Sequence, residues 1–248
     1  MSAIVFGCVL GGMFFGIFLR NRLPENHLSG ATKDVVRLGT GLIGTIAALV
    51  LGLLIGSANS TYQTQSTQIQ QLTANIIVLD RTLAEYGPEA DLARNLLRRA
   101  VVAVADGIWR ESGSDSRNRE PFEASAAGLA FYDEILKLSP RDDKQRSLQA
   151  RAIDAAQDLA KTRLLLFAEA GMTIPMPFLV VLVSWLAIIF ASFSLFADNN
   201  ATTIGALGIF GLSASASIFL ILELSQPFSG IMMIPSEQLR NALAPLGS

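Results

Sequence analysis

Leu38–Ser57 reads LGTGLIGTIAALVLGLLIGS, a stretch of twenty residues without a charged side chain. About twenty apolar residues suffice for a helix to cross the hydrocarbon core of a membrane, so this stretch predicts a transmembrane helix. Small residues recur along it at four-residue spacing and would form one ridge of the helix, namely Gly44, Ala48, Gly52 and Gly56. Such a ridge lets a second helix approach closely, so we expect it to mediate helix packing.

An aliphatic stripe lies opposite this ridge, again with four-residue spacing. It consists of Ile46, Val50 and Leu54. Inside a membrane, such a stripe can face lipid, another helix or a path for water and ions. The periodicity alone does not decide among these three environments.

The rest of the composition also indicates a membrane protein. Of the 248 residues, 51% are hydrophobic and only 16% are charged, which is too apolar for an ordinary soluble domain. Three further apolar segments, 3–19, 178–197 and 201–222, are long enough to span a membrane. We therefore predict four domains along the chain: 3–57 with spans 1 and 2 and a basic connecting loop, 58–176 as an extramembrane helical bundle, 177–222 with spans 3 and 4, and 223–248 as a C-terminal tail.

The insert between spans 2 and 3 has helical periodicity. A seam with three- and four-residue spacing predicts that span 2 continues as one long helix until Gly87–Pro88; its members are Ile69, Leu72, Ile76, Leu79, Leu83 and Tyr86. Three more helices are predicted, to about residue 111, over 122–138, and from the cap Ser139–Pro140 to about 170. The fold class is thus an all-α integral membrane protein with about four helices in its insert.

Several classes of function find no support in the sequence. Neither His27 nor Cys8 has the neighbouring side chains that a metal site or a nucleophilic enzyme needs, and we predict no catalytic residue, no metal and no cofactor. Carboxylates in the insert, such as Asp80 beside Arg81 and the pair Asp142 and Asp143, are interpreted as surface charge. The formal net charge of −2 and the absence of a basic face exclude nucleic acid as a partner.

Positive charge gathers in one short connection, between spans 1 and 2. The four basic residues there are Arg20, Arg22, Lys33 and Arg37. Basic residues in short loops favour the cytoplasmic side, so this loop is predicted to be cytoplasmic, with the helical insert and both termini outside.

Two short motifs then point to a known family. The first is LGLLIG at Leu51–Gly56, followed by Asn59 and Tyr62, and the second is ELSQPFSGIMMIP at Glu223–Pro235. The residues of the second motif that we single out are Glu223, Pro227, Phe228 and Gly230. With two spans, a helical insert, two spans and this tail, the chain resembles the bestrophin-like family of bacterial membrane proteins over essentially its whole length.

This resemblance carries expectations about function. It implies a homo-oligomer in the bacterial cytoplasmic (inner) membrane, a pentamer if it assembles as bestrophin channels do, with inorganic ions as partners. In those channels the second span lines a hydrophobic neck, and the resemblance places Ile46, Val50 and Leu54 at the neck positions. It also implies that the insert faces the cytoplasm, opposite to the charge bias. No acidic cluster follows Phe228, so calcium gating is not implied.

Two functions stay open at this point. One is an oligomeric ion channel whose second span lines the neck. The other is a non-conducting membrane sensor that binds a ligand or a partner through its helical insert.

Overall fold

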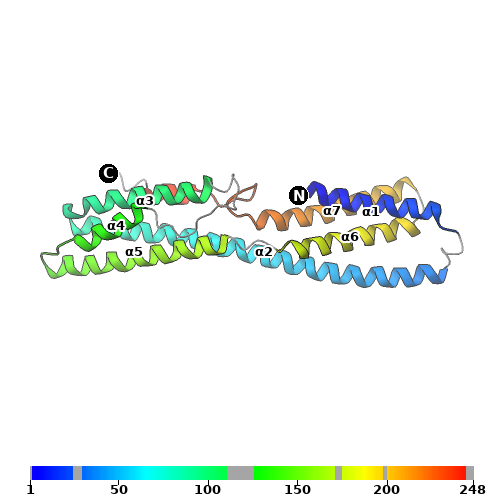
Figure 1. Ribbon diagram of the computed structural model, residues 1–248, viewed down its shortest axis with the longest axis horizontal. Coiled ribbons are helices and arrows are strands. Elements are labelled where there is room, and N and C mark those ends of the chain that lie inside the picture. The colour runs from blue at the N-terminus through cyan, green and yellow to red at the C-terminus, as the bar shows by residue number, and fades with distance from the viewer. Residues whose placement is uncertain (1, 25–29, 111–125, 171–174, 198–199, 244–248) are drawn as a thin grey trace. The chain divides into compact units, whose positions relative to one another are not determined.

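The computed structural model describes the chain except for residues 1, 25–29, 111–125, 171–174, 198–199 and 244–248. The described residues form helices and turns and contain no β-strand. In chain order (Figure 1) the elements are α1 (Ser2–Arg22), α2 (Gly30–Tyr86), the short 3₁₀ helix η2 (Pro88–Ala90), α3 (Asp91–Arg110), α4 (Ala126–Lys137), α5 (Asp143–Ala170), α6 (Met176–Phe196), α7 (Ala201–Leu224) and α8 (Glu237–Leu243).

The chain divides into two compact units. We call Met1–Thr61 with Ile174–Ser225 the membrane unit, and Tyr62–Thr173 with Gln226–Ser248 the helical unit. Four of the described helices, α1, α2, α6 and α7, are long and apolar enough to cross a membrane. These helices confirm the predicted all-α membrane fold with four spans.

In the membrane unit, α1 packs closely on α6 because two of its glycines leave room for the neighbouring backbone. A Cβ atom added at Gly12 would lie 2.5 Å from the carbonyl oxygen of Ala187, and one added at Gly16 would overlap the carbonyl of Ala191. These glycines are four residues apart and therefore lie on the same face of α1. They are a small-residue contact between membrane helices.

Buried aliphatic side chains also join the helices of the membrane unit. One cluster joins α1, α2, α6 and α7 and consists of Val5, Ala47, Leu182, Ile189 and Ile218. The Arg20 guanidinium at the end of α1 donates a hydrogen bond to the carbonyl of Ala197, just after α6. The ends of α1 and α6 are thus tied together by a polar bond as well as by packing.

The helical unit is built around the predicted seam of α2. All six seam residues, from Ile69 to Tyr86, are at most 3% exposed. Five of them, from Leu72 to Tyr86, share a cluster with apolar side chains of α3, α4 and α5 such as Leu97, Ile135 and Leu148. The helix ends at Gly87, whose φ of +120° is rarely adopted by other residues. The prediction of one continuous helix up to Gly87 is confirmed, because α2 runs from Gly30 to Tyr86.

The predicted start of α5 was three residues too early. The helix begins at Asp143, and the Asp142 carboxylate accepts a hydrogen bond of 2.7 Å from the backbone N–H of Gln145. Gln145 in turn accepts a bond of 2.8 Å from the backbone N–H of Arg141 through its side-chain oxygen. This reciprocal cap satisfies N–H groups that a helix start leaves without partners. Residues 122–125 of the helix predicted over 122–138 lie outside the described residues, and α4 covers Ala126–Lys137.

Candidate functional site on helix α2

The small-residue ridge of α2 lies open in the described part of the chain. A Cβ atom added at Gly44, Gly52 or Gly56 would meet no atom within 4 Å, and Ala48 is exposed. This contrasts with Gly12 on α1, which the backbone of α6 covers. No described residue therefore covers the ridge, which leaves it open to lipid or to a second copy.

The aliphatic stripe of α2 turns from the surface toward the interior of the membrane unit. Ile46 is 40% exposed and Val50 is half-buried, while Leu54 packs against the cluster that contains Ala47. The cause is helix geometry, because residues four apart are rotated by about 40° per step in a helix of 3.6 residues per turn. Ile46 is thus more accessible to an outside partner than Val50 and Leu54, which are both half-buried.

Large aliphatic side chains are also exposed on α2 beside the ridge. Their exposed fractions are 76% for Leu38, 64% for Leu42, 65% for Leu49 and 74% for Leu53. The stretch Leu38–Ser57 carries no charge, so its exposed surface is uniformly apolar and suits lipid or another protein surface. These four leucines are not among the residues predicted from the sequence, although their spacing of four, seven and four residues is visible in it.

The residues of the two family motifs fall into both units. Asn59 is exposed and Glu223 is half-buried near the end of α7, and both belong to the membrane unit. Tyr62 and Phe228 belong to the helical unit, where both pack against one apolar cluster. The buried members of that cluster are Ile69, Ile108, Leu166 and Ile234.

The C-terminal tail folds back on α3 through a turn. Pro227 is buried, and its carbonyl accepts a hydrogen bond of 2.7 Å from the N–H of Ile234. Gly230, in the middle of this turn, has a φ of +96°, which explains why glycine occupies that position. The Phe228 ring meets the edge of Trp109 at a centroid distance of 5.9 Å, and the Trp109 indole N–H donates a bond of 2.9 Å to the Ile234 carbonyl.

The contact between Trp109 and Ile234 in this region was not predicted from the sequence. A half-buried tryptophan needs an acceptor for its N–H. The position of Trp109 at the end of an amphipathic helix therefore indicates that its indole donates a hydrogen bond. No local pattern indicates that the acceptor lies 125 residues further along the chain.

We expect Trp109→Phe to destabilise the helical unit by about 1 kcal/mol, because an aromatic ring remains while the hydrogen bond to Ile234 is lost. Thermal unfolding of the purified protein in detergent, followed by circular dichroism, measures the effect. Unchanged unfolding of this variant would show that the indole bond contributes nothing to the docking of the tail.

The interpretation of Asp80 as surface charge is wrong. Asp80 is only 7% exposed, and Arg94 of α3 binds its carboxylate through two nitrogens at 2.8 and 3.3 Å. The hydrogen bond to Asp80 raises the pKa of Arg94 above its ordinary value. Asp142 and Asp143 are exposed as expected, one as the cap of α5 and the other paired with Arg146 at 2.7 Å.

Groups that could bind a metal ion do not come together in the described residues. No three of their His, Cys, Asp and Glu side chains lie where they could hold a metal ion. Cys8 lies on the exposed side of α1, and His27 is outside the described residues.

Comparison with solved structures shows the same fold. A crystal structure of a bacterial bestrophin homologue from Klebsiella pneumoniae with a single substitution matches with a TM-score of 0.69 at 16% identity, over 98% of this chain and 99% of that one. A second structure of a Klebsiella pneumoniae bestrophin homologue matches with a TM-score of 0.68 at 18% identity, over 97% of each chain. A crystal structure described as a membrane protein variant gives 0.70 at 17% identity, over 98% of each chain.

The family of the chain is assigned from its sequence. No curated protein matches the chain. The family model described as "Bestrophin-like domain" matches residues 7–239, which include both motifs, most of the first span, the other three spans and the helical insert. The chain therefore belongs to the bestrophin-like family.

Proposed function

We propose that the protein assembles into an oligomeric ion-conducting pore in which α2 lines a hydrophobic neck formed by Ile46, Val50 and Leu54. The observation that supports this most is the exposed, uncharged surface of α2 between Leu38 and Ser57, which no described part of the chain covers. Membership of the bestrophin-like family adds to it, because the resemblance implies pentameric channels with the second span at the neck.

The two faces of α2 have separate roles in this proposal. The open ridge of Gly44, Ala48, Gly52 and Gly56 is where a neighbouring copy packs, since small residues permit close approach without a clash. The stripe then faces the axis of the assembly at Ile46, its exposed end, while Leu54 lies at its inner edge, packed against the membrane unit. A narrow ring of aliphatic side chains excludes water and thereby resists ion passage. The basic loop between α1 and α2 supports an orientation with that loop in the cytoplasm.

A polar substitution in the stripe should open the neck. We expect Val50→Ser to raise ion flux in proteoliposomes about tenfold, which corresponds to a barrier lowered by about 1.4 kcal/mol, because a hydroxyl lets water enter the constriction. Flux is measured separately for potassium and chloride. Leu49→Ser is the matched control: it also removes an aliphatic side chain from α2, at a position that is 65% exposed and outside the stripe.

The same purified samples test whether the protein assembles as proposed. Electron microscopy in detergent is expected to show a five-fold ring with α2 innermost. Absence of flux from the wild type and from every variant, in a well-folded oligomer, would contradict the channel and favour the non-conducting sensor. Equal effects of Val50→Ser and Leu49→Ser would contradict the assignment of the stripe to the neck.

A further inference from the structure

A pocket in the membrane unit lies between the first part of α2 and the end of α6. Its volume is about 350 Å³, which is within the range of about 300–1,000 Å³ typical of small-molecule sites. Its wall combines one charged side chain and two hydroxyls with apolar side chains. These lining residues include Arg37, Thr40, Ser192, Val36, Phe193 and Phe196.

The pocket lies where two membrane-spanning helices reach the end of their apolar segments. Arg37 directly precedes the uncharged stretch Leu38–Ser57 of α2, and the pocket extends to Ala197, the residue after the end of α6. An arginine at the end of a span reaches the headgroup layer of the bilayer, whereas the apolar residues that follow it lie in the hydrocarbon. A ligand in this pocket is therefore at the boundary between lipid headgroups and acyl chains.

Arg37 supplies the charge of the pocket. It is the one charged side chain among the described residues that line the pocket, and it is exposed. No described residue forms a hydrogen bond or an ion pair with its side chain. A guanidinium can hold two phosphate oxygens at once through parallel N–H groups, so Arg37 suits a phosphate ligand.

The surroundings of the pocket favour a ligand with net negative charge. Arg20 donates a hydrogen bond to the carbonyl of Ala197, which brings the basic end of α1 to the pocket. Lys33 precedes Arg37 by about one turn of α2. Basic residues beside a membrane attract anionic lipids, and they repel the ammonium group of a zwitterionic lipid.

The rest of the wall suits the part of a phospholipid that lies below its phosphate. Thr40 is only 7% exposed and Ser192 is half-buried, and both hydroxyls can donate hydrogen bonds to phosphate or ester oxygens. Phe193 is 49% exposed and Phe196 is half-buried, so both rings offer apolar surface to an acyl chain. Cation, hydroxyls and aromatic rings thus match phosphate, ester groups and hydrocarbon.

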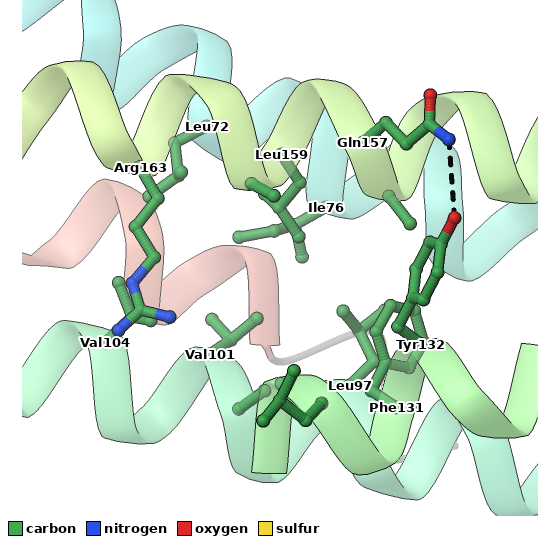
Figure 2. A pocket seen from close by; sticks show the side chains of 15 residues that line it. Leu72, Ile76, Leu97, Val101, Val104, Phe131, Tyr132, Gln157, Leu159 and Arg163 are labelled. Carbon is green, nitrogen blue, oxygen red and sulfur yellow. Dashed lines mark hydrogen bonds between the residues drawn. The ribbon is translucent and has the colours of Figure 1, made fainter. Parts of the chain in front are cut away.

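A pocket of equal volume in the helical unit does not offer this chemistry. It lies between α2, α3, α4 and α5, and its wall is mostly aliphatic and aromatic (Figure 2). There the Gln157 amide already donates a hydrogen bond of 3.3 Å to the Tyr132 hydroxyl. The Arg163 guanidinium lies 5.6 Å from the centre of the Phe167 ring. A phosphate would compete with these interactions, whereas at Arg37 it would displace no described side chain.

We propose that the pocket between α2 and α6 binds an anionic phospholipid of the surrounding bilayer, with its phosphate on Arg37 and an acyl chain along Phe193 and Phe196. The ligand is a lipid rather than free phosphate because much of the wall is apolar and adjoins the hydrocarbon. The proposal does not depend on ion conduction, since its residues belong to the membrane unit and none of them to the aliphatic stripe.

Titration of the full-length protein with phosphatidylglycerol, followed by native mass spectrometry in a non-ionic detergent, tests the proposal. We expect saturable binding of one lipid per chain. Phosphatidylcholine, whose headgroup has no net charge, should bind at least about fivefold more weakly. Arg37→Gln should lower the affinity for phosphatidylglycerol at least about tenfold, the scale of a lost charged hydrogen bond.

Arg22→Gln is the matched control for the charge. It removes the same charge from an exposed site in the same basic connection, and Arg22 does not line the pocket. Its effect on the affinity for phosphatidylglycerol should stay below about threefold, the scale of an exposed charge.

A second pair of variants tests the space in the pocket independently of the charge. Gly41 lines the pocket, and a Cβ atom added there would meet no described atom within 4 Å. Gly41→Leu should therefore fill part of the pocket without a backbone clash and weaken the binding of phosphatidylglycerol. Gly39→Leu should leave binding unchanged, because Gly39 is equally open but does not line the pocket.

The proposal is overturned if the wild type shows no saturable binding of phosphatidylglycerol, or if Arg37→Gln or Gly41→Leu binds it as tightly as the wild type. Equal losses in Arg22→Gln and Arg37→Gln would also overturn it, because the attraction would then belong to the whole basic surface. Glycerol phosphate, which lacks acyl chains, should not compete; competition as strong as that of the lipid would identify a soluble phosphate compound as the ligand. Circular dichroism of each variant confirms that it is folded before titration.

Discussion

Gly12→Leu is expected to separate α1 from α6 and to destabilise the membrane unit by about 3 kcal/mol or more. The Cβ atom alone would lie 2.5 Å from the Ala187 carbonyl oxygen and 3.0 Å from the Ala187 Cα. These are backbone atoms, so the clash cannot be relieved by rotating a side chain. Overpacking that the backbone must relieve costs more free energy than overpacking that core side chains relieve by changing rotamer. The neighbouring small residue Gly16 offers no relief, because it too meets the α6 backbone.

Gly11→Leu is the matched control for this prediction. Gly11 precedes Gly12 directly, is exposed, and would place a Cβ atom in open space. Leucine also has a higher helix propensity than glycine, so the control should be as stable as the wild type or slightly more stable. Thermal unfolding and the monodisperse fraction after size-exclusion chromatography measure both variants. Similar losses in the two would contradict the close contact between α1 and α6.

The spans and the seam of α2 could be predicted because each depends on local composition or periodicity. Twenty uncharged residues at Leu38–Ser57 are enough to specify a span. The three- and four-residue spacing from Ile69 to Tyr86 specifies a buried helix face, and the structure buries every one of those residues.

The partner of each face could not be predicted in the same way. Gly12 with Gly16 and Gly52 with Gly56 show the same spacing, yet the first pair meets α6 and the second meets no described atom. Spacing tells which residues share a helix face, but not which helix comes to that face. For the same reason, the sequence does not show that Ile46 is more exposed than Leu54. The structure shows it, because Leu54 packs against the cluster that contains Ala47.

The partners of buried polar groups could not be predicted from the sequence either. Asp80 directly follows the seam residue Leu79, and its neighbour Arg81 suggested an exposed charge pair. Its actual partner is Arg94, fourteen residues away across the turn between α2 and α3. The cap at Asp142 was missed because Ser139–Pro140 is an equally good local start signal, and the bond from Asp142 to Gln145 decides between them.

Arg94→Gln is expected to destabilise the helical unit by about 3 kcal/mol, the scale for breaking a buried ion pair. The Asp80 side chain is only 10% exposed and the Arg94 side chain 24%, so the carboxylate left behind would have little access to water. Fluorescence can follow this unit alone, because Trp109 lies in the helical unit and the other tryptophan, Trp185, lies in the membrane unit. The measurement is therefore made in a Trp185→Phe background.

Two further variants distinguish the loss of this ion pair from a general effect of removing a charge. Arg99→Gln removes an exposed arginine from the same helix, and its effect should stay within about 0.5 kcal/mol. The double variant Asp80→Asn with Arg94→Gln removes both charges, so it should be more stable than Arg94→Gln alone, since no unpaired carboxylate remains. If the double variant is instead less stable than Arg94→Gln by the full cost of Asp80→Asn, the two side chains act independently and the buried carboxylate is not the source of the loss.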